Sequence, residues 1–416
     1  MPDVKAPPLA IWALGLTQIV GYGTLFYSFS VLAPAMGAEL AFSQQWVFAA
    51  LSAALFLGSL LAPTAGRCAD RFGAGRVMTV GSIAASAALV ACALAPGRIT
   101  FVSALIAMEL ASCFVLYATA FAAIVQIGPA GAQRSITHLT LIAGFASTLF
   151  WPLTSLLHEY LTWREVYLVF AALNFFICLP IHAWLMQLSR RRNDALAANV
   201  GSAPLAPADH VPLDASQIRM AFLLMMAGFA IEGFVLSAIL LHMVPLLSVL
   251  GLGAAGVFVA TLFGPSQVAS RLVNMVFGGR LPQTLLAVIA ASLLAAGLLV
   301  LVLTSPWIPG IAVFAILFGL GSGLTSIVGG TLPLELFGRA GYGARLGWVS
   351  AARQFSSSFA PFVFAFMMAQ WSVDVSLWTL IAIGSGGVAV FVLIALVRRR
   401  SSHAAMPPDG ALLPSE

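Results

Sequence analysis

Twelve long runs of apolar residues limit the fold of this chain more than any other feature. A helix needs about 20 mostly apolar residues to cross the hydrocarbon core of a bilayer. Only helices and closed barrels satisfy their backbone hydrogen bonds in lipid, and these runs are too long and too uniformly apolar for barrel strands. The sequence therefore predicts an all-α membrane protein with twelve transmembrane helices. The expected spans are residues 9–35, 45–65, 77–96, 99–127, 136–158, 165–188, 217–244, 255–277, 284–304, 310–337, 347–370 and 376–397.

The composition excludes a water-soluble protein. Of the 416 residues, 61% are hydrophobic and 8% are charged, whereas ordinary soluble domains carry about 25% charged residues. The four cysteines, Cys68, Cys92, Cys113 and Cys178, include no close pair, which favours small apolar packing residues over a zinc site or a disulfide framework. We therefore expect neither a metal nor a cofactor. Because the sequence has no nucleotide-binding loop and no soluble catalytic domain, we also expect no enzyme activity.

The basic residues predict the orientation of the chain, because cytoplasmic loops carry an excess of Lys and Arg. With a cytoplasmic N-terminus, fifteen of the nineteen Lys and Arg fall in inward loops and tails. Arg98 and Arg164 fall outside, and Arg271 and Arg353 fall within spans. Both termini are thus expected in the cytoplasm, and the protein in the inner (cytoplasmic) membrane of the cell. Since the arginines lie between apolar runs, they do not indicate nucleic-acid binding.

The spans divide into two sets of six. Residues 189–216 are rich in Ala, Pro and Asp and begin with an arginine cluster, which is typical of a flexible cytoplasmic linker. They separate an N-terminal bundle (9–188) from a C-terminal bundle (217–397), with a short N-terminus (1–8) and a polar tail (398–416) on the cytoplasmic side. The two sets echo each other at an offset near 210 residues, as in "GPAGAQR" and "GRAGYGAR". Such echoes indicate a duplicated six-helix unit.

A loop motif links this pattern to a known family. The stretch "GRCADRFGAGR", residues 66–76, lies between the second and third spans. It resembles the Gly-x-x-x-Asp-Arg-x-Gly-x-x-Arg loop of the major facilitator superfamily (MFS), and the matching positions are Gly66, Asp70, Arg71, Gly73 and Arg76. The resemblance implies two pseudo-symmetric six-helix bundles and a cytoplasmic gate formed by this loop. Glycines permit the tight turn, and Asp70 can cap a facing helix end or pair with an arginine.

The second half contains a degenerate copy of this motif. Its sequence "FGGRLPQ" keeps Arg280 but has lost the acid. The sequence therefore gives no support for a matching latch in the C-terminal half.

Two further features resemble the monocarboxylate and oxalate–formate porters. Residues 27–44, "YSFSVLAPAMGAELAFSQ", are similar to the end of the first span in those porters, which also commonly carry an arginine in the eighth span, where this chain has Arg271. The resemblance implies a monomeric secondary active transporter that moves a small, monocarboxylate-like organic anion by alternating access, coupled to protons. Efflux of a hydrophobic or toxic small molecule is the alternative, and the two intramembrane arginines count against it.

Arg271 lies roughly 13 Å along its helix from the cytoplasmic edge, at 1.5 Å per residue. A mid-span arginine costs about 2.5–3.5 kcal/mol. An anion in a water-filled cavity would offset this cost, and the planar guanidinium suits a carboxylate. A structural bridge to an acid on a neighbouring helix is the alternative. Asn274 lies on the same helix face and would either orient the guanidinium or contact the ligand.

A second arginine, Arg353, lies in "LGWVSAARQFSSSFAPFVF" about two helical turns from the cytoplasmic end. It resembles the second basic residue that oxalate–formate-like porters can carry in the eleventh span. Extension of its side chain to the membrane surface explains its position equally well.

Two acids also fall within spans, Glu109 and Glu232. Burial away from water disfavours the charged form of a carboxyl group. Either residue could carry the coupled proton or neutralise an arginine, and Glu232 lies in the same half as both arginines.

Aromatic residues complete the candidate binding site: Tyr22, Tyr27, Tyr117 and Trp151. The tyrosines could contact substrate, although Tyr near span ends more often anchors a protein at the membrane interface.

Overall fold

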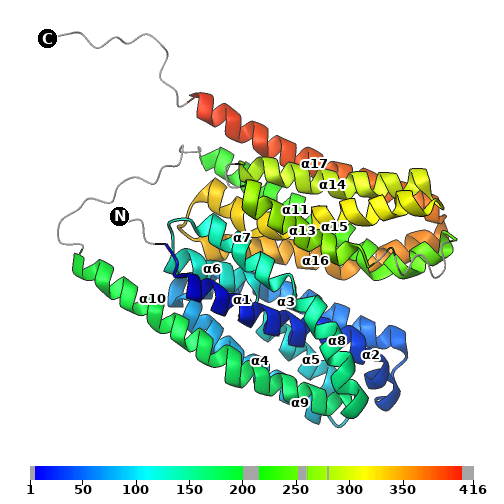
Figure 1. The fold of residues 1–416 in the computed structure, drawn as a ribbon, viewed down its shortest axis with the longest axis horizontal. Coiled ribbons are helices and arrows are strands. Elements are labelled where there is room, and N and C mark those ends of the chain that lie inside the picture. Colours follow the sequence, from blue (N-terminus) through cyan, green and yellow to red (C-terminus); the bar gives the residue numbers. More distant parts are fainter. Residues whose placement is uncertain (1–4, 200–214, 252–258, 260, 279–280, 405–416) are drawn as a thin grey trace.

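Helices account for almost all of the described chain in the computed structural model, and they lie roughly side by side (Figure 1). The structure describes residues 5–199, 215–251, 259, 261–278 and 281–404. In these ranges every assigned element is an α-helix or a π-helical turn, and Lys5 makes isolated β-bridges with Pro129 and Ala130. The all-α prediction is therefore confirmed.

The N-terminal half of the described chain contains several interrupted spans. The first is interrupted by the π-helical turn η1 and the sixth by the π-helical turn η2, while the fourth and fifth each break into two helices. The apolar runs give no sign of these interruptions. The elements are α1 (Pro8–Tyr22), η1 (Gly23–Tyr27), α2 (Ser28–Glu39), α3 (Gln44–Phe72), α4 (Ala74–Leu94), α5 (Arg98–Ser112), α6 (Tyr117–Ile127), α7 (Ala132–Ala143), α8 (Ala146–Tyr160), α9 (Trp163–Leu173), η2 (Asn174–Cys178) and α10 (Leu179–Asn199).

The C-terminal half is built from longer helices. They are α11 (Ala215–Val249), α13 (Phe263–Phe277), α14 (Gln283–Thr304), α15 (Ile308–Phe337), α16 (Tyr342–Gln370) and α17 (Val373–Ala404). Helix α10 continues past residue 189, where the linker was expected to begin. Residues 200–214 of that linker, Arg280 and residues 405–416 of the tail lie outside the described residues.

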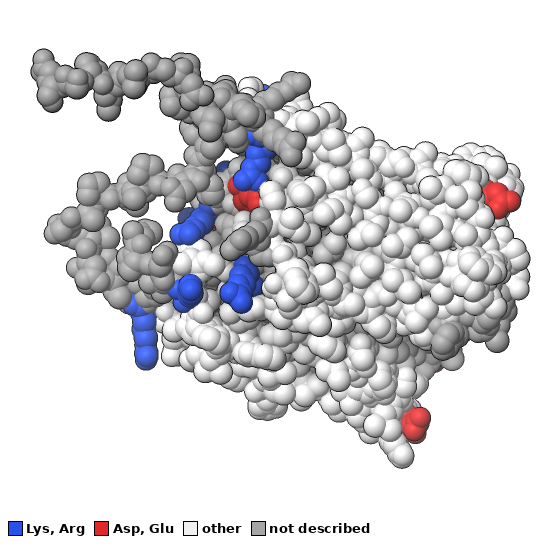
Figure 2. Space-filling view, turned by 45° about the horizontal axis from the view of Figure 1, so that its top comes forward, with Lys and Arg blue, Asp and Glu red and all other residues white. Residues whose placement is uncertain are grey.

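The surface of the described helices suits a lipid environment. Ten helical stretches are long and apolar enough to cross a membrane. The other two expected spans correspond to α13, of which 15 residues are described, and α16, a 29-residue helix that contains two arginines. Large apolar side chains face outward: Leu303 is 66% exposed, Phe176 72% and Phe362 74%. In Figure 2, Lys and Arg gather at one end of the molecule and the broad flank carries almost no charge.

The buried core is divided between the two halves. One cluster of buried apolar residues lies entirely in the N-terminal half, and two lie entirely in the C-terminal half. A fourth joins the halves, because Leu334, Tyr342 and Leu346 pack there against residues of the N-terminal half. In Figure 1 the helices of the N-terminal half form the lower group and those of the C-terminal half the upper group.

The two glycines of the sequence echo have the same backbone conformation. Gly131 precedes α7 with φ of 75°, Gly341 precedes α16 with φ of 61°, and both occupy the N-cap position. Residues other than glycine rarely adopt this left-handed conformation. The same backbone requirement therefore explains why both copies of the repeated sequence have glycine at this position. The match supports a duplicated unit.

Helices α3 and α16 approach each other very closely at glycines. A Cβ atom on Gly66 would lie 2.1 Å from the carbonyl oxygen of Gly343, and one on Gly347 would lie 2.5 Å from that of Ala62. These neighbours are backbone atoms, which cannot rotate away. The contact between the halves therefore depends on the absence of side chains here.

We predict that Gly66→Ala lowers the melting temperature of the purified protein in detergent, because overpacking costs about 1–3 kcal/mol. Gly97→Ala is the matched control, since no atom lies within 4 Å of its added Cβ. Equal melting temperatures for the two variants would contradict the close α3–α16 contact.

Candidate functional site

Four of the predicted binding residues form one aromatic cluster. The ring centroid of Tyr22 lies 4.6 Å from that of Tyr117 and 6.4 Å from that of Tyr27. The Tyr27 ring also meets the Trp151 ring edge-on at 5.8 Å. The three tyrosines are partly buried, and Trp151 is 49% exposed. The cluster thus combines apolar rings with the hydroxyl groups of three partly buried tyrosines.

The positions of these rings depend on interruptions in the helices. Tyr27 ends η1, Tyr117 begins α6 after the break that follows α5, and Trp151 lies in α8 beyond the break that follows α7. The turn η1 is held in place by Asn174 in η2, whose Nδ2 donates a 2.8 Å hydrogen bond to Oγ1 of Thr24. Single π-helical turns within α-helices occur frequently at functional sites.

Arg271 in α13 is 4% exposed and is surrounded by neutral acceptors. Its Nη1 donates to the carbonyl oxygen of Thr140 at 3.1 Å, its Nη2 to Oγ of Ser326 at 3.1 Å, and its Nε to the carbonyl oxygen of Gly323 at 3.5 Å. These bonds use three of the five N–H groups of the guanidinium. Neither salt bridge in the described residues involves Arg271. The bridge to an acid that the sequence allowed is thus not found among the described residues.

Arg353 in α16 is partly buried and packs against α11. A Cβ on Gly233 would lie 2.7 Å from Cγ of Arg353, and no hydrogen bond or salt bridge to Arg353 is found among the described residues. Both arginines are within electrostatic range of Tyr27 and Tyr117. Two cations of the C-terminal half thus face the aromatic cluster of the N-terminal half.

Glu232 in α11 is 3% exposed and lies within electrostatic range of Arg353, but the two form no salt bridge. Neither of its side-chain oxygens has a hydrogen-bond donor among the described residues. The hydroxyl group of Thr325 lies beside it and donates to the carbonyl oxygen of Gly321 at 3.0 Å. In that arrangement a protonated Glu232 can donate to the hydroxyl oxygen, whereas a carboxylate can accept from the hydroxyl only if it rotates away from Gly321.

Glu109 lies in α5, within the N-terminal half, and is also 3% exposed. Its Oε2 accepts a long 3.5 Å hydrogen bond from Ser112, and its Oε1 has no partner in the described structure. Neither salt bridge among the described residues involves Glu109. The two buried acids therefore differ in their surroundings, because only Glu232 interacts with an arginine of the candidate site.

Asn274 does not orient the guanidinium of Arg271. Its side-chain oxygen lies over Gly278, at the end of α13, where an added Cβ would be 2.0 Å away. That oxygen has no hydrogen-bond partner among the described residues. Contact of Asn274 with a ligand stays a prediction.

The loop motif meets the other half of the protein through Asp70. Its Oδ1 accepts a hydrogen bond from the backbone N–H of Gly343 at 2.9 Å, and its Oδ2 accepts one from that of Ala344 at 2.7 Å. These N–H groups belong to the first turn of α16, where N–H groups have no acceptor within the helix itself. A carboxylate is also favoured at a helix N-terminus by the helix dipole. Asp70 therefore caps a helix of the opposite half.

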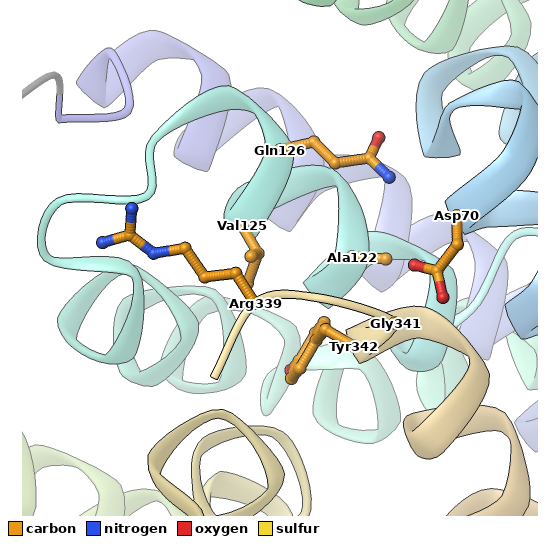
Figure 3. Close-up of a pocket in the computed structure, with 7 residues that line it drawn as sticks. All are labelled: Asp70, Ala122, Val125, Gln126, Arg339, Gly341 and Tyr342. Atoms are coloured by element: carbon orange, nitrogen blue, oxygen red, sulfur yellow. The ribbon is translucent and has the colours of Figure 1, made fainter. Parts of the chain in front are cut away.

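The remaining motif residues shape the same end of the molecule. Gly73 joins α3 to α4 with φ of 87°, a conformation that favours glycine. Arg71 stacks over the ring of Phe72 at 5.1 Å, and Arg76 is exposed. Figure 3 shows the Asp70 carboxylate beside the segment that leads into α16, at the edge of a cavity of about 240 Å³. This cavity is lined by Asp70, Ala122, Val125, Gln126, Arg339, Gly341 and Tyr342.

An equivalent contact at the same end of each half was not apparent from the sequence. Gln126 in α6 accepts a 2.8 Å hydrogen bond from the N–H of Ala74, the first residue of α4. Glu335 in α15 accepts a 2.7 Å hydrogen bond from the N–H of Gln283, the first residue of α14, and also pairs with Arg398. In both halves the acceptor follows its donor by 52 residues in the sequence. The C-terminal half therefore does hold an acid at this end, supplied by α15 and not by the degenerate motif.

Comparison with known proteins identifies the family to which the chain belongs. Residues 14–308 match the family model described as "Major Facilitator Superfamily". No curated protein sequence matches the chain.

Two solved structures show the same fold. The human organic anion transporter MFSD10 (TETRAN) matches with a TM-score of 0.68 and 14% sequence identity, covering 92% of this chain and 100% of that chain. The proton:xylose symporter XylE, bound to 6-bromo-6-deoxy-D-glucose, matches with a TM-score of 0.68 and 13% identity, covering 92% of this chain and 96% of that chain. The family model, the helical architecture and these two structures agree: the chain belongs to the major facilitator superfamily of membrane transporters.

Proposed function

We propose that this protein is a secondary active transporter that moves a small carboxylate across the cytoplasmic membrane by alternating access, coupled to protons. The surroundings of Arg271 give this proposal its main support. Its charge is buried, its described hydrogen-bond acceptors are all neutral, and no acid pairs with it. A buried charge is costly unless it is paired, so an anionic solute is the partner that this site lacks.

The chemistry of the site fits a carboxylate. Two N–H groups of Arg271 remain after its three hydrogen bonds, enough for a two-point contact with one carboxylate group. Tyr27 and Tyr117 lie near both arginines and can donate their hydroxyl protons to the same anion. Arg353 adds a second positive charge. A small carboxylate can use these groups, in line with the sequence resemblance to the monocarboxylate and oxalate–formate branch of the superfamily.

Glu232 is the proton site that we propose. As a carboxylate it gains a donor only if the Thr325 hydroxyl gives up its bond to Gly321, whereas in its protonated form it can donate to Thr325 and leave that bond in place. Its electrostatic interaction with Arg353 links its charge to the anion site. When the anion binds and offsets the charge of Arg353, the carboxylate of Glu232 loses part of its stabilisation, and proton uptake becomes more favourable.

Alternating access would take place between the bundles 9–188 and 217–397. The contact of Asp70 with Gly343 and Ala344 closes one end of the interface, and we assign that end to the cytoplasm, together with both chain termini. Since both bundles and the proposed site lie within one chain, we propose that the monomer transports.

Arg271→Ala is predicted to abolish uptake of formate, acetate, lactate or oxalate into proteoliposomes, whichever of these the wild type transports. Charge-assisted hydrogen bonds contribute about 1.5–3 kcal/mol each, so the affinity should fall at least tenfold. Arg271→Lys should restore little of the carboxylate uptake, because an ammonium group lacks the planar, two-pronged geometry of the guanidinium.

The control for this experiment is Arg219→Ala, which removes an exposed arginine at the beginning of α11. It should transport like the wild type. Normal carboxylate uptake by Arg271→Ala would contradict the anion site. Uptake by the wild type of hydrophobic compounds and of no carboxylate would favour the efflux alternative.

Glu232→Gln is predicted to uncouple transport from protons, because the amide cannot exchange a proton. The variant should still exchange labelled for unlabelled anion across proteoliposomes but should no longer accumulate it in response to a pH gradient. Glu109→Gln makes the same change in the other half and should keep the coupling. If Glu232→Gln accumulates anion normally, Glu232 is not the proton site.

A further inference from the structure

The break between α7 and α8 presents a backbone acceptor to Arg271. Helix α7 ends at Ala143, and the N–H of Gly144 donates a 3.0 Å hydrogen bond to the carbonyl oxygen of Thr140. The same oxygen accepts the 3.1 Å hydrogen bond from Nη1 of Arg271. Thr140 thus supplies one of the last carbonyl groups of α7, and the guanidinium lies at the C-terminal end of that helix.

The carbonyl oxygen of Thr140 accepts both the intrahelical N–H of Gly144 and the guanidinium, which its two lone pairs allow. Helix α8 begins at Ala146, directly after the break, so the partial positive charge of its N-terminus adjoins the C-terminus of α7. Arg271 is therefore held here by a hydrogen bond to one carbonyl oxygen, within the membrane interior, where water is not available to replace it.

This hydrogen bond joins the two halves of the protein. Helix α7 belongs to the N-terminal half and α13, which carries Arg271, belongs to the C-terminal half. The two helices are in contact and lie side by side in Figure 1. The other two acceptors of Arg271, Gly323 and Ser326, belong to α15 of its own half. Separation of α7 from α13 would therefore break the bond to Thr140 and leave the other two in place.

Gly144 makes this arrangement possible. A Cβ atom at that position would lie 2.1 Å from Nη1 of Arg271, closer than non-bonded atoms can approach. Any residue other than glycine would therefore push the guanidinium away from the end of α7. The backbone of Gly144 itself has an ordinary helical conformation, so the requirement is for space and not for a special φ angle.

We infer that the Arg271–Thr140 hydrogen bond holds α7 against α13 in the anion-free protein, and that Gly144 is the positioning residue that admits the guanidinium to the Thr140 carbonyl oxygen. A bound carboxylate takes the place of that carbonyl oxygen as a partner of the guanidinium and lowers the cost of separating the two helices. This inference deepens the proposed function and rests on it for the identity of the anion.

Anion binding and separation of α7 from α13 are thermodynamically linked. If the anion binds better when α7 and α13 are apart, a change that weakens the Arg271–Thr140 bond without removing the arginine should raise the apparent affinity for the anion. Gly144→Ala is such a change. A variant that merely damaged the site would lower the affinity.

The first test measures the distance between the two helices without any anion. Spin labels at Arg134→Cys, in the first turn of α7, and Phe277→Cys, at the end of α13, report it by double electron–electron resonance in lipid nanodiscs, with the four native cysteines replaced. Both labelled positions are exposed. Gly144→Ala should increase the population with separated helices. Gly264→Ala, in α13, has no atom within 4 Å of the added Cβ and should keep the wild-type distances.

The second test measures binding of formate, acetate, lactate and oxalate by calorimetry. Loss of one hydrogen bond to a charged group predicts that Gly144→Ala binds the preferred anion on the order of tenfold more tightly than the wild type. In the Arg271→Ala background the same change should have no effect on the distances, because the added Cβ then meets no guanidinium. This double variant also covers the case in which Gly144→Ala alone does not fold.

Unchanged distances in Gly144→Ala, weaker anion binding by that variant, or an equal effect of the change at Gly144 with and without Arg271 would each overturn the inference. Failure of the proposed function looks different. In that case the wild type binds none of the four anions, while the anion-free distances still decide whether the end of α7 holds Arg271.

Discussion

The absence of water from the hydrocarbon core governs this structure, because every polar group there must find its partner within the protein. Most of the chain meets this condition with long apolar helices. At the candidate site the condition is met only in part. In the part of the chain that the structure describes, Arg271 has neutral acceptors without a counter-ion, and the side-chain oxygens of Glu232 have no hydrogen-bond partner. A transporter needs such incomplete partners, since a site that is already fully satisfied has nothing to gain from its solute.

The same polar contacts connect the two halves of the protein. Asp70 reaches the N-terminus of α16, and Arg271 reaches the C-terminus of α7. In each case a side chain of one half binds backbone groups in the terminal turn of a helix in the other half. Such polar contacts can be exchanged for contacts with water as the halves move apart. They suit an interface that must open and close repeatedly.

Much of the fold could be predicted from the sequence, because span length and apolarity are local properties. The MFS motif likewise identified Asp70, whose partner is a helix end. The breaks that follow α1, α5 and α7 could not be predicted, since they lie within continuous apolar runs of the sequence. Arg271 was recognisable as a charge inside a span. Its acceptor on Thr140 was not, because a backbone carbonyl group has no signature in the sequence.

Transport as proposed here requires a carboxylate that completes the partners of Arg271. A cryo-electron microscopy structure of the protein with its transported carboxylate would show whether it does. The expected result is an anion within hydrogen-bond distance of the guanidinium of Arg271 and beside Tyr27 and Tyr117. An anion bound elsewhere, with Arg271 still held only by Thr140, Gly323 and Ser326, would contradict the claim.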